Sequence, residues 1–302
     1  MHDSVSAVIV TYHPKLEHLA ALFEALSTQA TQVIVVDNGS EPEVLVWLLE
    51  QARAWGITVL SLGDNLGIAI AQNHGIKRAM QSKARFVLLL DQDSMPCAGM
   101  VDELCRAATT PTSSGRQVAA VGPIHVAAPG LASDTLFITF DSFWPRKQAC
   151  AAETDRIPSD LLTASGTLIP TEVFDVVGLM DEGLFIDHVE TDWCFRARAK
   201  NMDLFGVCRA RLIHRIGMRT ARIWLGSWKH VPVHMPLRHY YLTRNTLIVG
   251  RRSWVPSGWK RYMAYVVFVL LLRNVFIYPR LRRMRMIGRG IVDGLAGRLG
   301  RF

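Results

Sequence analysis

Cysteine-based metal motifs and a secretory signal are both missing from this 302-residue sequence. The cysteines are odd in number and include no CxxC pair or other spacing typical of metal ligands. No signal peptide follows Met1-His2-Asp3. These absences predict reduced thiols in a cytoplasmic protein. The five cysteines are Cys97, Cys105, Cys150, Cys194 and Cys208.

Two widespread nucleotide-binding motifs are absent as well. The sequence has neither the G-x-x-x-x-G-K-S/T of a P-loop nor the G-x-G-x-x-G of a dinucleotide site. It shows no evident Ser-His-Asp or Cys-His arrangement, no internal repeat and no recognised DNA- or RNA-binding motif. Nucleic acid is therefore not an expected partner, and the enzyme classes that depend on those motifs are not supported.

Acidic residues are almost missing from the last third of the chain. Residues 216–302 contain 17 Lys and Arg against one acid, Asp293, whereas residues 1–215 carry a net charge of −8. A basic region attached to an acidic body is expected to face an anionic partner.

The basic region contains an apolar run, residues 262–272, that Arg273 interrupts. Eleven apolar residues are too few for a membrane span, which takes about 20. Together with the arginines downstream, the run predicts amphipathic helices lying on the anionic cytoplasmic face of a membrane. The alternative is a buried C-terminal helix or an oligomer contact, and the sequence predicts no particular oligomeric state. The downstream arginines are Arg280, Arg282, Arg283, Arg285 and Arg289.

Apolar, β-branched runs alternate with helical repeats over the first hundred residues. The strand-like runs are SAVIVTY, QVIVVD, ITVLSL and RFVLLL, and the helical ones are LEHLAALFEALSTQ, EPEVLVWLLEQARAWG and GIAIAQNHGIKRAMQ. Continuous apolar strands between helices indicate a mostly parallel sheet covered on both faces, which is an α/β fold. We expect this domain over residues 1–235 and a helical, basic region over residues 236–302.

Polar residues follow each of the four predicted strands. In open α/β sheets, ligands bind outside the carboxyl ends of the strands, so these residues are expected on one rim. The alternative for the segment 37–40 is a turn that caps the next helix. The rim residues are Thr11 and Tyr12, Asp37 and Asn38, Asp64 and Asn65, and Asp91 and Asp93.

The sequence Asp91-Gln92-Asp93 places two carboxylates at the end of a buried strand. Two such acids repel each other, and hard oxygen ligands of this kind suit Mg²⁺ or Mn²⁺ bound together with substrate phosphates. Asn65, Gly67 and Asn73 are expected near a helix N-terminus, where free N–H groups favour phosphate. We therefore expect a divalent metal and a phosphate-bearing ligand at this rim.

A second acidic group stands at Asp187, Glu190 and Asp192, where a helix is predicted to begin. A carboxylate beside a metal–phosphate site can take the proton from an attacking hydroxyl. The alternative is that these acids only stabilise the helix N-terminus. His214 ends a later strand and is either a third metal ligand or an ordinary surface histidine.

Seven segments then occur in a recognisable order. They are SAVIVTYHP, VIVVDNGS, DNLGIAIAQNHGI, LLLDQDS, TASGTLIP, FIDHVETDWCFRARAKN and HYYLTRN. Over about residues 4–250 the sequence resembles family 2 glycosyltransferases with the GT-A fold, and is most similar to the bacterial rhamnosyltransferase branch. The resemblance implies a Rossmann-like domain that binds a nucleotide-sugar.

The resemblance also implies roles for the donor-binding residues. Asp91 would approach the ribose or sugar, and Asp93 would bind a divalent metal, with His214 completing the metal site. Ser165 and Gly166 would line the pocket of the donor sugar. The base and ribose would lie at Thr11, Tyr12 and Asp37, and the nucleotide-sugar would contact Asn65 and Gly67.

Glu190 matches the family's catalytic position, two residues before Asp192, and would be the general base. Val189 precedes it where the family more often has an acid, so Asp187 and Asp192 remain rivals for the role. The implied reaction is an inverting, metal-dependent transfer, and its implied donor is dTDP-L-rhamnose. The acceptor would be a glycan or lipid-linked molecule in the synthesis of a cell-surface polysaccharide such as O-antigen or exopolysaccharide, at the cytoplasmic face of the inner membrane.

Other functions remain open on the sequence alone. The donor of the same fold could carry a galactofuranosyl or another hexosyl group. A nucleotidyltransferase is expected to carry a glycine-rich loop with a basic residue after the first strand, and VTYHPKL has no glycine there. A non-catalytic membrane scaffold is disfavoured because the two-aspartate motif, Glu190 and His214 are all present.

Overall fold

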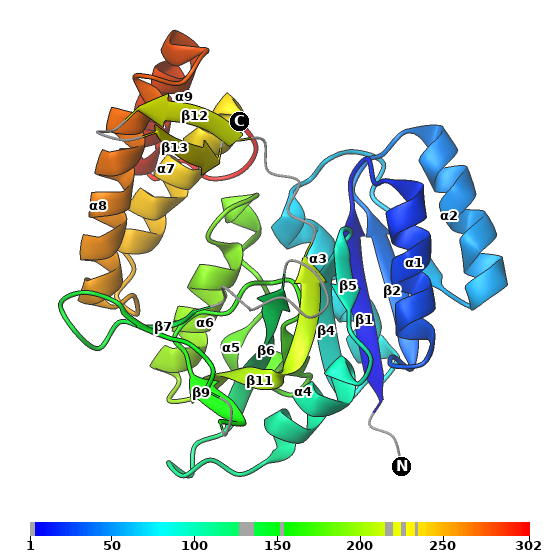
Figure 1. Cartoon of the computed structure of the whole chain (residues 1–302). Coiled ribbons are helices and arrows are strands. Elements are labelled where there is room, and N and C mark those ends of the chain that lie inside the picture. The colour runs from blue at the N-terminus through cyan, green and yellow to red at the C-terminus, as the bar shows by residue number, and fades with distance from the viewer. Residues whose placement is uncertain (1–3, 127–135, 152–153, 215–219, 225–227, 233–234) are drawn as a thin grey trace.

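The computed structural model describes residues 4–126, 136–151, 154–214, 220–224, 228–232 and 235–302 (Figure 1). Four parallel strands form the first half of its main sheet, in the order β3-β2-β1-β4. They are β1 (Val5–Thr11), β2 (Gln32–Asp37), β3 (Thr58–Ser61) and β4 (Phe86–Asp91). The predicted α/β alternation is confirmed here, because each strand matches a continuous apolar run.

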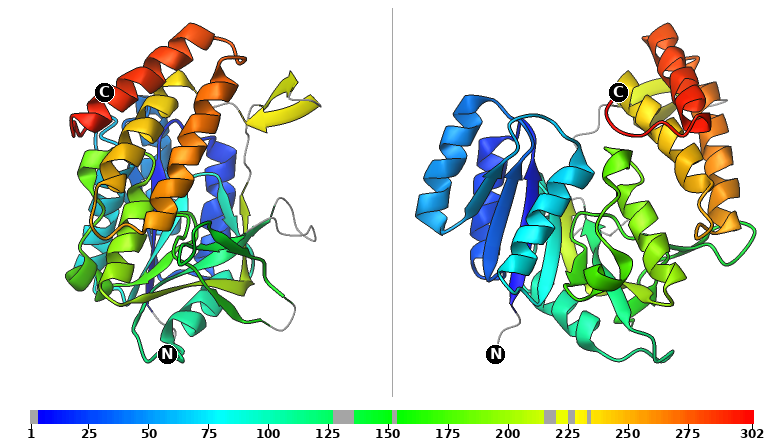
Figure 2. Two further views of the ribbon diagram at one scale, coloured as in Figure 1. Left: turned by 90° about the vertical axis from the view of Figure 1, so that its left-hand side faces the viewer. Right: turned by 180° about the vertical axis from the view of Figure 1, so that it is seen from behind.

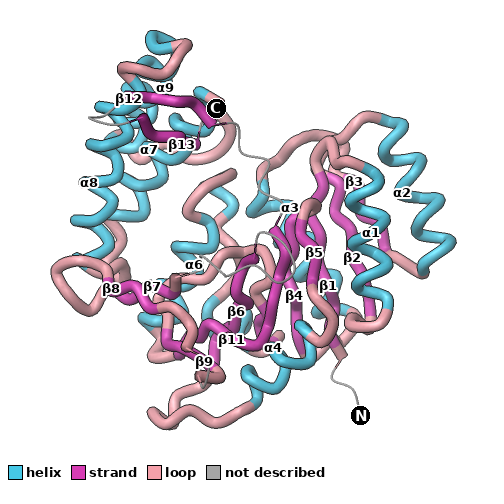
Figure 3. The backbone as a smooth tube through the Cα atoms, viewed as in Figure 1, coloured by secondary structure: helices cyan, strands magenta, loops and turns pink. Residues whose placement is uncertain are grey.

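The second half of the sheet mixes directions (Figure 3). β10 (Leu168–Pro170) runs antiparallel to both β4 and β6 (Val118–Val126), and β11 (Asp203–His214) runs parallel to β6. β5 (Ser94–Pro96) and β9 (Arg156–Pro158) pair antiparallel with β11. The three-residue strands carry no visible period of two, so the sequence did not predict β5, β9 or β10.

Helices cover both faces of the sheet, as the sequence predicted. One buried cluster joins one face of β1 and β4 to α1 (Leu16–Ser27), α2 (Pro42–Trp55) and α4 (Met100–Thr109). The other cluster joins the opposite face to α3 (Ile68–Gln81), α5 (Val173–Val177) and α6 (Val189–Ala199). A short 3-10 turn, η1 (Glu182–Leu184), lies between α5 and α6.

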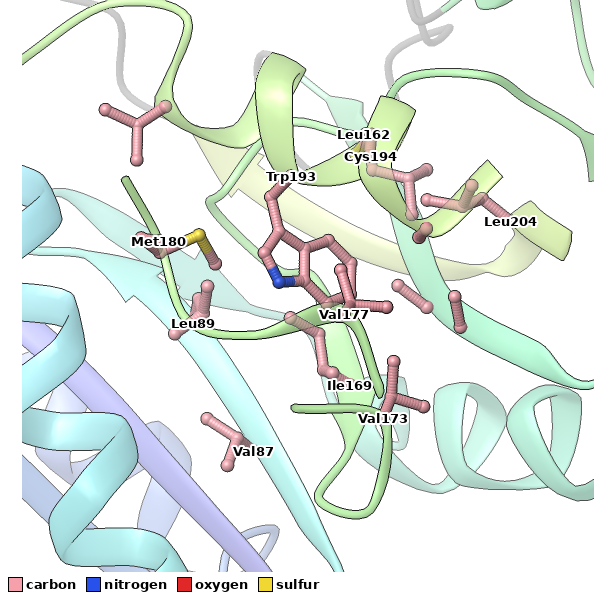
Figure 4. Packing of buried hydrophobic residues seen from close by; sticks show 14 of the residues in the cluster. Val87, Leu89, Leu162, Ile169, Val173, Val177, Met180, Trp193, Cys194 and Leu204 are labelled. Carbon is pink, nitrogen blue, oxygen red and sulfur yellow. The ribbon is translucent and has the colours of Figure 1, made fainter. Parts of the chain in front are cut away.

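Trp193 of α6 is the large side chain at the centre of the second cluster (Figure 4). It is 1% exposed, and its indole N–H donates to the carbonyl oxygen of Gly178 at 2.9 Å. The apolar surface of its ring packs within this cluster, and its one polar atom is hydrogen-bonded. This is the usual condition for burying tryptophan. This packing fixes the helix whose first turn carries Glu190.

Three helices, α7 (Pro236–Gly250), α8 (Ser257–Asn274) and α9 (Arg280–Leu295), form a separate layer beside the sheet domain (Figure 2). α7 begins at Pro236. Two small antiparallel hairpins complete the chain: β7 (Phe137–Thr139) with β8 (Arg146–Gln148), and β12 (Thr220–Trp224) with β13 (Trp228–Pro232). Among the described residues, no helix is both long enough and apolar enough to cross a membrane.

The expectation of reduced thiols throughout is wrong for one pair. Cys150, after β8, forms a disulfide with Cys208 of β11, with a Cα–Cα distance of 5.6 Å. The two residues are 58 positions apart in sequence, so their approach depends on the tertiary path of the chain and leaves no local spacing signal. Cys97, Cys105 and Cys194 are free.

Candidate donor-binding and catalytic site

The ends of β1 and β2 meet at the rim, where Thr11 pairs in register with Asp37. The Thr11 hydroxyl donates to Asp37 Oδ1 at 3.0 Å, and Ser40 donates its hydroxyl and its backbone N–H to the same carboxylate. Thr11 is 0% exposed and Asp37 is 1% exposed. Both side chains are therefore engaged in a turn, and of the three residues expected to hold the base and ribose, Tyr12 is the exposed one.

The loop after β3 is joined to the loop after β2. Asn38 donates its side-chain amide to Asn65 Oδ1 at 3.2 Å, and Asn65 Oδ1 also accepts from the backbone N–H of Gly67. Gly67 has φ +95°, and a Cβ there would lie 2.7 Å from the carbonyl oxygen of Phe185. This position therefore requires glycine, and it brings the loop after β3 against the segment that precedes α6.

The predicted phosphate contact of Asn73 does not agree with its surroundings. Its side chain is 1% exposed, donates to the carbonyl oxygen of Met180 at 3.0 Å and accepts from the Met180 N–H at 2.9 Å. Asn73 also donates to Glu182 Oε1. It therefore joins α3 to the segment before η1, and the first N–H of α3, that of Ile68, already donates to Phe185.

The two-aspartate segment lies at the end of β4, between β1 and β11. Asp91 pairs in register with Val10, and Ser94 of β5 pairs with His214. Between the two aspartates, Gln92 accepts from the Tyr12 N–H at 2.7 Å and donates to the Tyr12 carbonyl oxygen at 3.2 Å. Gln92 thus fixes this turn to β1, a role that the sequence did not suggest.

Ser165 and Gly166 lie directly behind this turn. The hydroxyls of Ser165 and Ser94 share a hydrogen bond, and Ser165 is 3% exposed. Gly166 has φ +88° and donates its N–H to the Leu89 carbonyl oxygen at 2.7 Å. Both residues support β4 and β5 from within the protein, whereas the sequence predicted that they line a sugar pocket.

An unusual backbone carries the second acidic group. Phe185, Asp187 and His188 all have positive φ, between 63° and 64°, which is costly for residues other than glycine. Asp187 Oδ1 accepts two hydrogen bonds from Arg238 of α7, each 3.1 Å long. Within the described part of the chain, Asp187 Oδ2 is buried without a hydrogen-bond partner. A buried, unpaired carboxylate oxygen of this kind suggests a position for a ligand group.

Glu190 lies in the first turn of α6, within the electrostatic influence of both acidic groups. Burial, followed by the negative charges of Asp187 and Asp91, raises the pKa of Glu190 to about 7. A carboxyl with such a pKa can accept a proton near neutral pH and retain it. Acids at the end of β4 and before α6 therefore both act on the carboxyl of Glu190.

Asp192, one of the rivals for the role of base, has a different environment. It is 0% exposed and forms ion pairs with Arg196 and Arg252, and Trp254 donates its indole N–H to Oδ1 at 3.0 Å. Both of its oxygens are therefore occupied by partners from α6 and from the segment after α7. These contacts support a structural role for Asp192 and leave Glu190 and Asp187 as the candidates for the general base.

Two residues of the HYYLTRN segment hold the strained backbone from the side of α7. Asn245 donates its side-chain amide to the carbonyl oxygens of Leu184, Ile186 and Asp187, at 2.8 to 2.9 Å. Arg244 donates to the Leu184 carbonyl oxygen at 3.0 Å and is itself 1% exposed. The sequence drew attention to this segment as a motif but assigned no role to Arg244, Asn245 or Arg238.

Part of the sequence matches the model of a known protein family. Residues 6–120, which run from β1 to the start of β6, match the model described as glycosyl transferase family 2. Over this segment the chain is similar to family 2 glycosyltransferases. The match contains the two-aspartate segment, while Glu190 and the helices that support it lie beyond residue 120.

The glycosyltransferase is similar to known proteins over nearly its full length. It is 28% identical to the dTDP-rhamnosyl transferase RfbF of Shigella flexneri over 303 aligned residues, which cover 99% of this chain and 98% of that protein. The solved mannosyltransferase PcManGT of Pyrobaculum calidifontis, in complex with GDP-Man and Mn²⁺, matches 96% of this chain and 86% of its own at 11% identity, with a TM-score of 0.57.

GalNAc-T7, solved with UDP, GalNAc and Mn²⁺, matches with a TM-score of 0.62 at 15% identity. The match covers 97% of this chain and 56% of GalNAc-T7, so the glycosyltransferase spans little more than half of that protein. These structural likenesses confirm the predicted GT-A fold.

The ligand set at the end of β4 fits a hard divalent ion that shares its coordination with phosphate oxygens. Asp91 and Asp93 are partly exposed, and the register of β5 and β11 places the backbone of His214 beside Ser94. The imidazole of His214 lies outside the described part of the structure. Among the described side chains, no group of three or more His, Cys, Asp or Glu residues is arranged to hold a metal. One carboxylate, here that of Asp93, together with substrate phosphate oxygens is nevertheless a sufficient protein contribution for Mg²⁺ or Mn²⁺.

Proposed function

We propose that this glycosyltransferase is an inverting rhamnosyltransferase that uses dTDP-L-rhamnose as its donor. The proposal of this donor is supported by the similarity to the dTDP-rhamnosyl transferase, which extends over 99% of the chain. The proposed acceptor is a glycan or lipid-linked sugar of a cell-surface polysaccharide, at the cytoplasmic face of the inner membrane. The near absence of acids from the C-terminal third, where Asp293 stands against 17 Lys and Arg, is consistent with an acceptor presented at an anionic surface.

The environment of Glu190 is the observation that carries the proposed mechanism. With a pKa raised to about 7, its carboxylate accepts the proton of the acceptor hydroxyl. The acceptor oxygen forms a bond to the anomeric carbon on the face opposite the nucleotide. The bond from that carbon to the diphosphate oxygen breaks with its electron pair, so the configuration is inverted and the nucleoside diphosphate leaves.

The remaining rim residues bind and orient. Asp93 and His214 would hold a divalent ion, which when bound supplies positive charge to the diphosphate. Asp91 would contact the ribose or sugar of the donor. Tyr12, exposed at the end of β1, would offer its ring to the base. Arg238 holds the carboxylate of Asp187 in place beside Glu190.

A donor panel scored by nucleotide release tests this function. We expect purified protein with Mg²⁺ or Mn²⁺ to release dTDP from dTDP-L-rhamnose faster than nucleotide from UDP- or GDP-sugars. Glu190→Gln should lower turnover by about 10²- to 10⁴-fold while leaving nucleotide binding intact. Glu172→Gln, an exposed acid at the start of α5, is the matched control and should retain full activity.

Two results would contradict the proposal. If no nucleotide-sugar is consumed and Asp93→Ala binds nucleotide as well as the unmodified protein, the site is not a donor site. If Glu190→Gln turns over at the normal rate with a true acceptor, Glu190 is not the base, and Asp187→Asn becomes the next variant to measure.

A further inference from the structure

α8 turns an apolar stripe toward solvent. Tyr265 is 53% exposed, Phe268 58% and Leu272 53%, and the spacing of three and four residues places them on one side of the helix. The stripe continues past the end of α8 through Phe276, which is 63% exposed. The other side of α8 packs inward through Trp259, Met263 and Leu270. This helix is therefore apolar on two sides, although one of them faces water.

The exposed stripe extends beyond the helix in both directions. At its start, the ring of Trp144 meets that of Tyr265 edge-on, with centroids 5.8 Å apart, and Trp144 is itself 51% exposed. At its end, Tyr278 is 88% exposed and Leu281, in the first turn of α9, is 83% exposed. We name this set the outer apolar surface: Trp144, Tyr265, Phe268, Leu272, Phe276, Tyr278 and Leu281.

Arginines border the outer apolar surface, with no carboxylates in the same stretch of sequence. Tyr278, Pro279 and the first two turns of α9 form an open hollow whose lining includes Arg280, Arg282 and Arg285. All three are exposed. Residues 204–292 contain neither Asp nor Glu. Aromatic and leucine side chains beside arginines that form no ion pair with another described residue match the interface of an anionic bilayer, where aromatic rings lie at the level of the headgroups and cations meet phosphates.

We propose that the outer apolar surface docks the enzyme on an anionic lipid bilayer, with its side chains inserted among the headgroups and acyl chains. A second copy of the chain fits this surface less well, because a twofold contact would bring the same arginines of both copies together. Docking of this kind does not require a helix that spans the bilayer. Among the described residues, no helix could do so. Docking is independent of the donor and of the chemistry at Glu190.

Co-sedimentation of the full-length protein with vesicles tests the proposal. The vesicles contain either phosphatidylcholine alone or phosphatidylcholine mixed with phosphatidylglycerol. The triple variant Phe276→Ser/Tyr278→Ser/Leu281→Ser should bind the anionic vesicles at least about a hundredfold more weakly. Arg280→Gln/Arg282→Gln/Arg285→Gln should lose about as much and should show a weaker dependence on salt.

The matched control lies on α2, at the other side of the molecule (Figure 1). Val46, Leu49 and Trp55 are 57%, 48% and 46% exposed, so Val46→Ser/Leu49→Ser/Trp55→Ser removes similar exposed apolar groups. This control should sediment with anionic vesicles as the unmodified protein does. Circular dichroism and nucleotide release with a soluble acceptor should be unchanged in all three triple variants.

Each alternative outcome overturns the proposal in its own way. A protein that stays in the supernatant with both vesicle types has no lipid-docking surface. Equal binding to both vesicle types removes the anionic preference, and equal losses in the α2 control remove the assignment to this surface. A dimer in solution that becomes monomeric in the Phe276/Tyr278/Leu281 variant would show that a second copy covers the surface instead.

Discussion

The side-chain amide of Asn245 donates a hydrogen bond to the backbone carbonyl oxygen of Asp187, at 2.9 Å. Asn245 belongs to α7, whereas Asp187 belongs to the strained segment that leads into α6. The conformation of the acidic segment is thus specified from outside, by a helix more than fifty residues further along the chain. Strain of this kind persists only when the surrounding structure holds it.

Asn245→Ala tests this relationship directly. The change removes the donor for three carbonyl oxygens, so we expect a loss of about 1–3 kcal/mol in the free energy of unfolding. Turnover should fall as well, because Glu190 follows the released segment. Chemical denaturation and the rate of nucleotide release measure the two effects. Leu237→Ala, at an exposed position of the same helix, should change neither. An unchanged turnover in a folded Asn245→Ala protein would contradict the positioning role.

Asp192→Asn should separate structure from chemistry at the start of α6. Removing the buried charge leaves Arg196 without its carboxylate and Arg252 with Asp181 alone, and breaking a buried pair in this way costs about 3–5 kcal/mol. Glu190→Gln removes no ion pair shown by the described residues and should unfold at a denaturant concentration close to normal. If Asp192→Asn proves as stable as Glu190→Gln but loses all turnover, Asp192 is the base instead.

The rate of transfer should depend on the ionisation of Glu190. Its pKa is raised from 4.5 to about 7, and only the carboxylate accepts a proton. We therefore expect kcat/KM to rise with pH through about 7 and to level off above it. Arg238→Gln removes a nearby positive charge that lowers this pKa, so the rise should move to higher pH. A profile that is flat between pH 5 and 9 would exclude Glu190 as the titrating base.

The titration of Glu190 should also affect the free energy of unfolding. As pH rises, the rate of transfer should increase whereas this contribution to stability should decrease. The raised pKa of Glu190 favours the folded state at low pH, and this contribution is lost as pH rises from about 4.5 to 7. Burial lowers the pKa of His188 from 6.5 to about 4. The contribution of neutral His188 to stability is therefore lost as pH falls from 6.5 to about 4. The two contributions oppose each other. Glu190→Gln should therefore lose more stability on acidification than the unmodified protein, as measured by thermal unfolding from pH 7 to 4.

The last residues of the chain return to the site. Gly300 donates its N–H to the Gly183 carbonyl oxygen at 2.7 Å, Phe302 donates to the Tyr241 hydroxyl, and Arg301 pairs with Asp64 in the loop after β3. Deleting residues 300–302 should lower the melting temperature and raise the KM for the donor several-fold. Arg301→Gln should have a much smaller effect on both quantities, because both partners of its ion pair are exposed. Equal effects of the two changes would show that the ion pair, and not the backbone contact, is decisive.

Local pattern was sufficient to predict the parallel half of the sheet. β1, β2 and β4 each contain an uninterrupted apolar run of four or five residues, and Gly56 follows α2 with φ 66°. The alternation with helices then predicted that the strand ends share one rim, and the register of Thr11 with Asp37 agrees with this. β5 and β10 could not be predicted, because strands of three residues give too short a pattern.

Within the site, the sequence predicted which residues gather but not which ones remain accessible. Thr11 and Ser165 are of the expected type, yet both are buried and bonded to other protein groups. Glu190 and Asp192 lie two residues apart, and Asp192 is distinguished by its contacts with Arg196, Arg252 and Trp254, the last two of which come from 60 or more residues further along the chain. Pairings over such distances, like that of Cys150 with Cys208, leave no periodic signal.

The contacts of Arg244 and Asn245 limit how this enzyme can be recombined with its relatives. A chimera with a breakpoint between residues 188 and 244 would take the carbonyl oxygens of Leu184 and Asp187 from one parent and their donors from the other. Even where both parents carry the same residue types, small differences in the placement of α7 would misalign these bonds. Donor specificity should therefore be exchanged by replacing the rim loops after β1 to β4, while residues 181–302 are inherited as one unit.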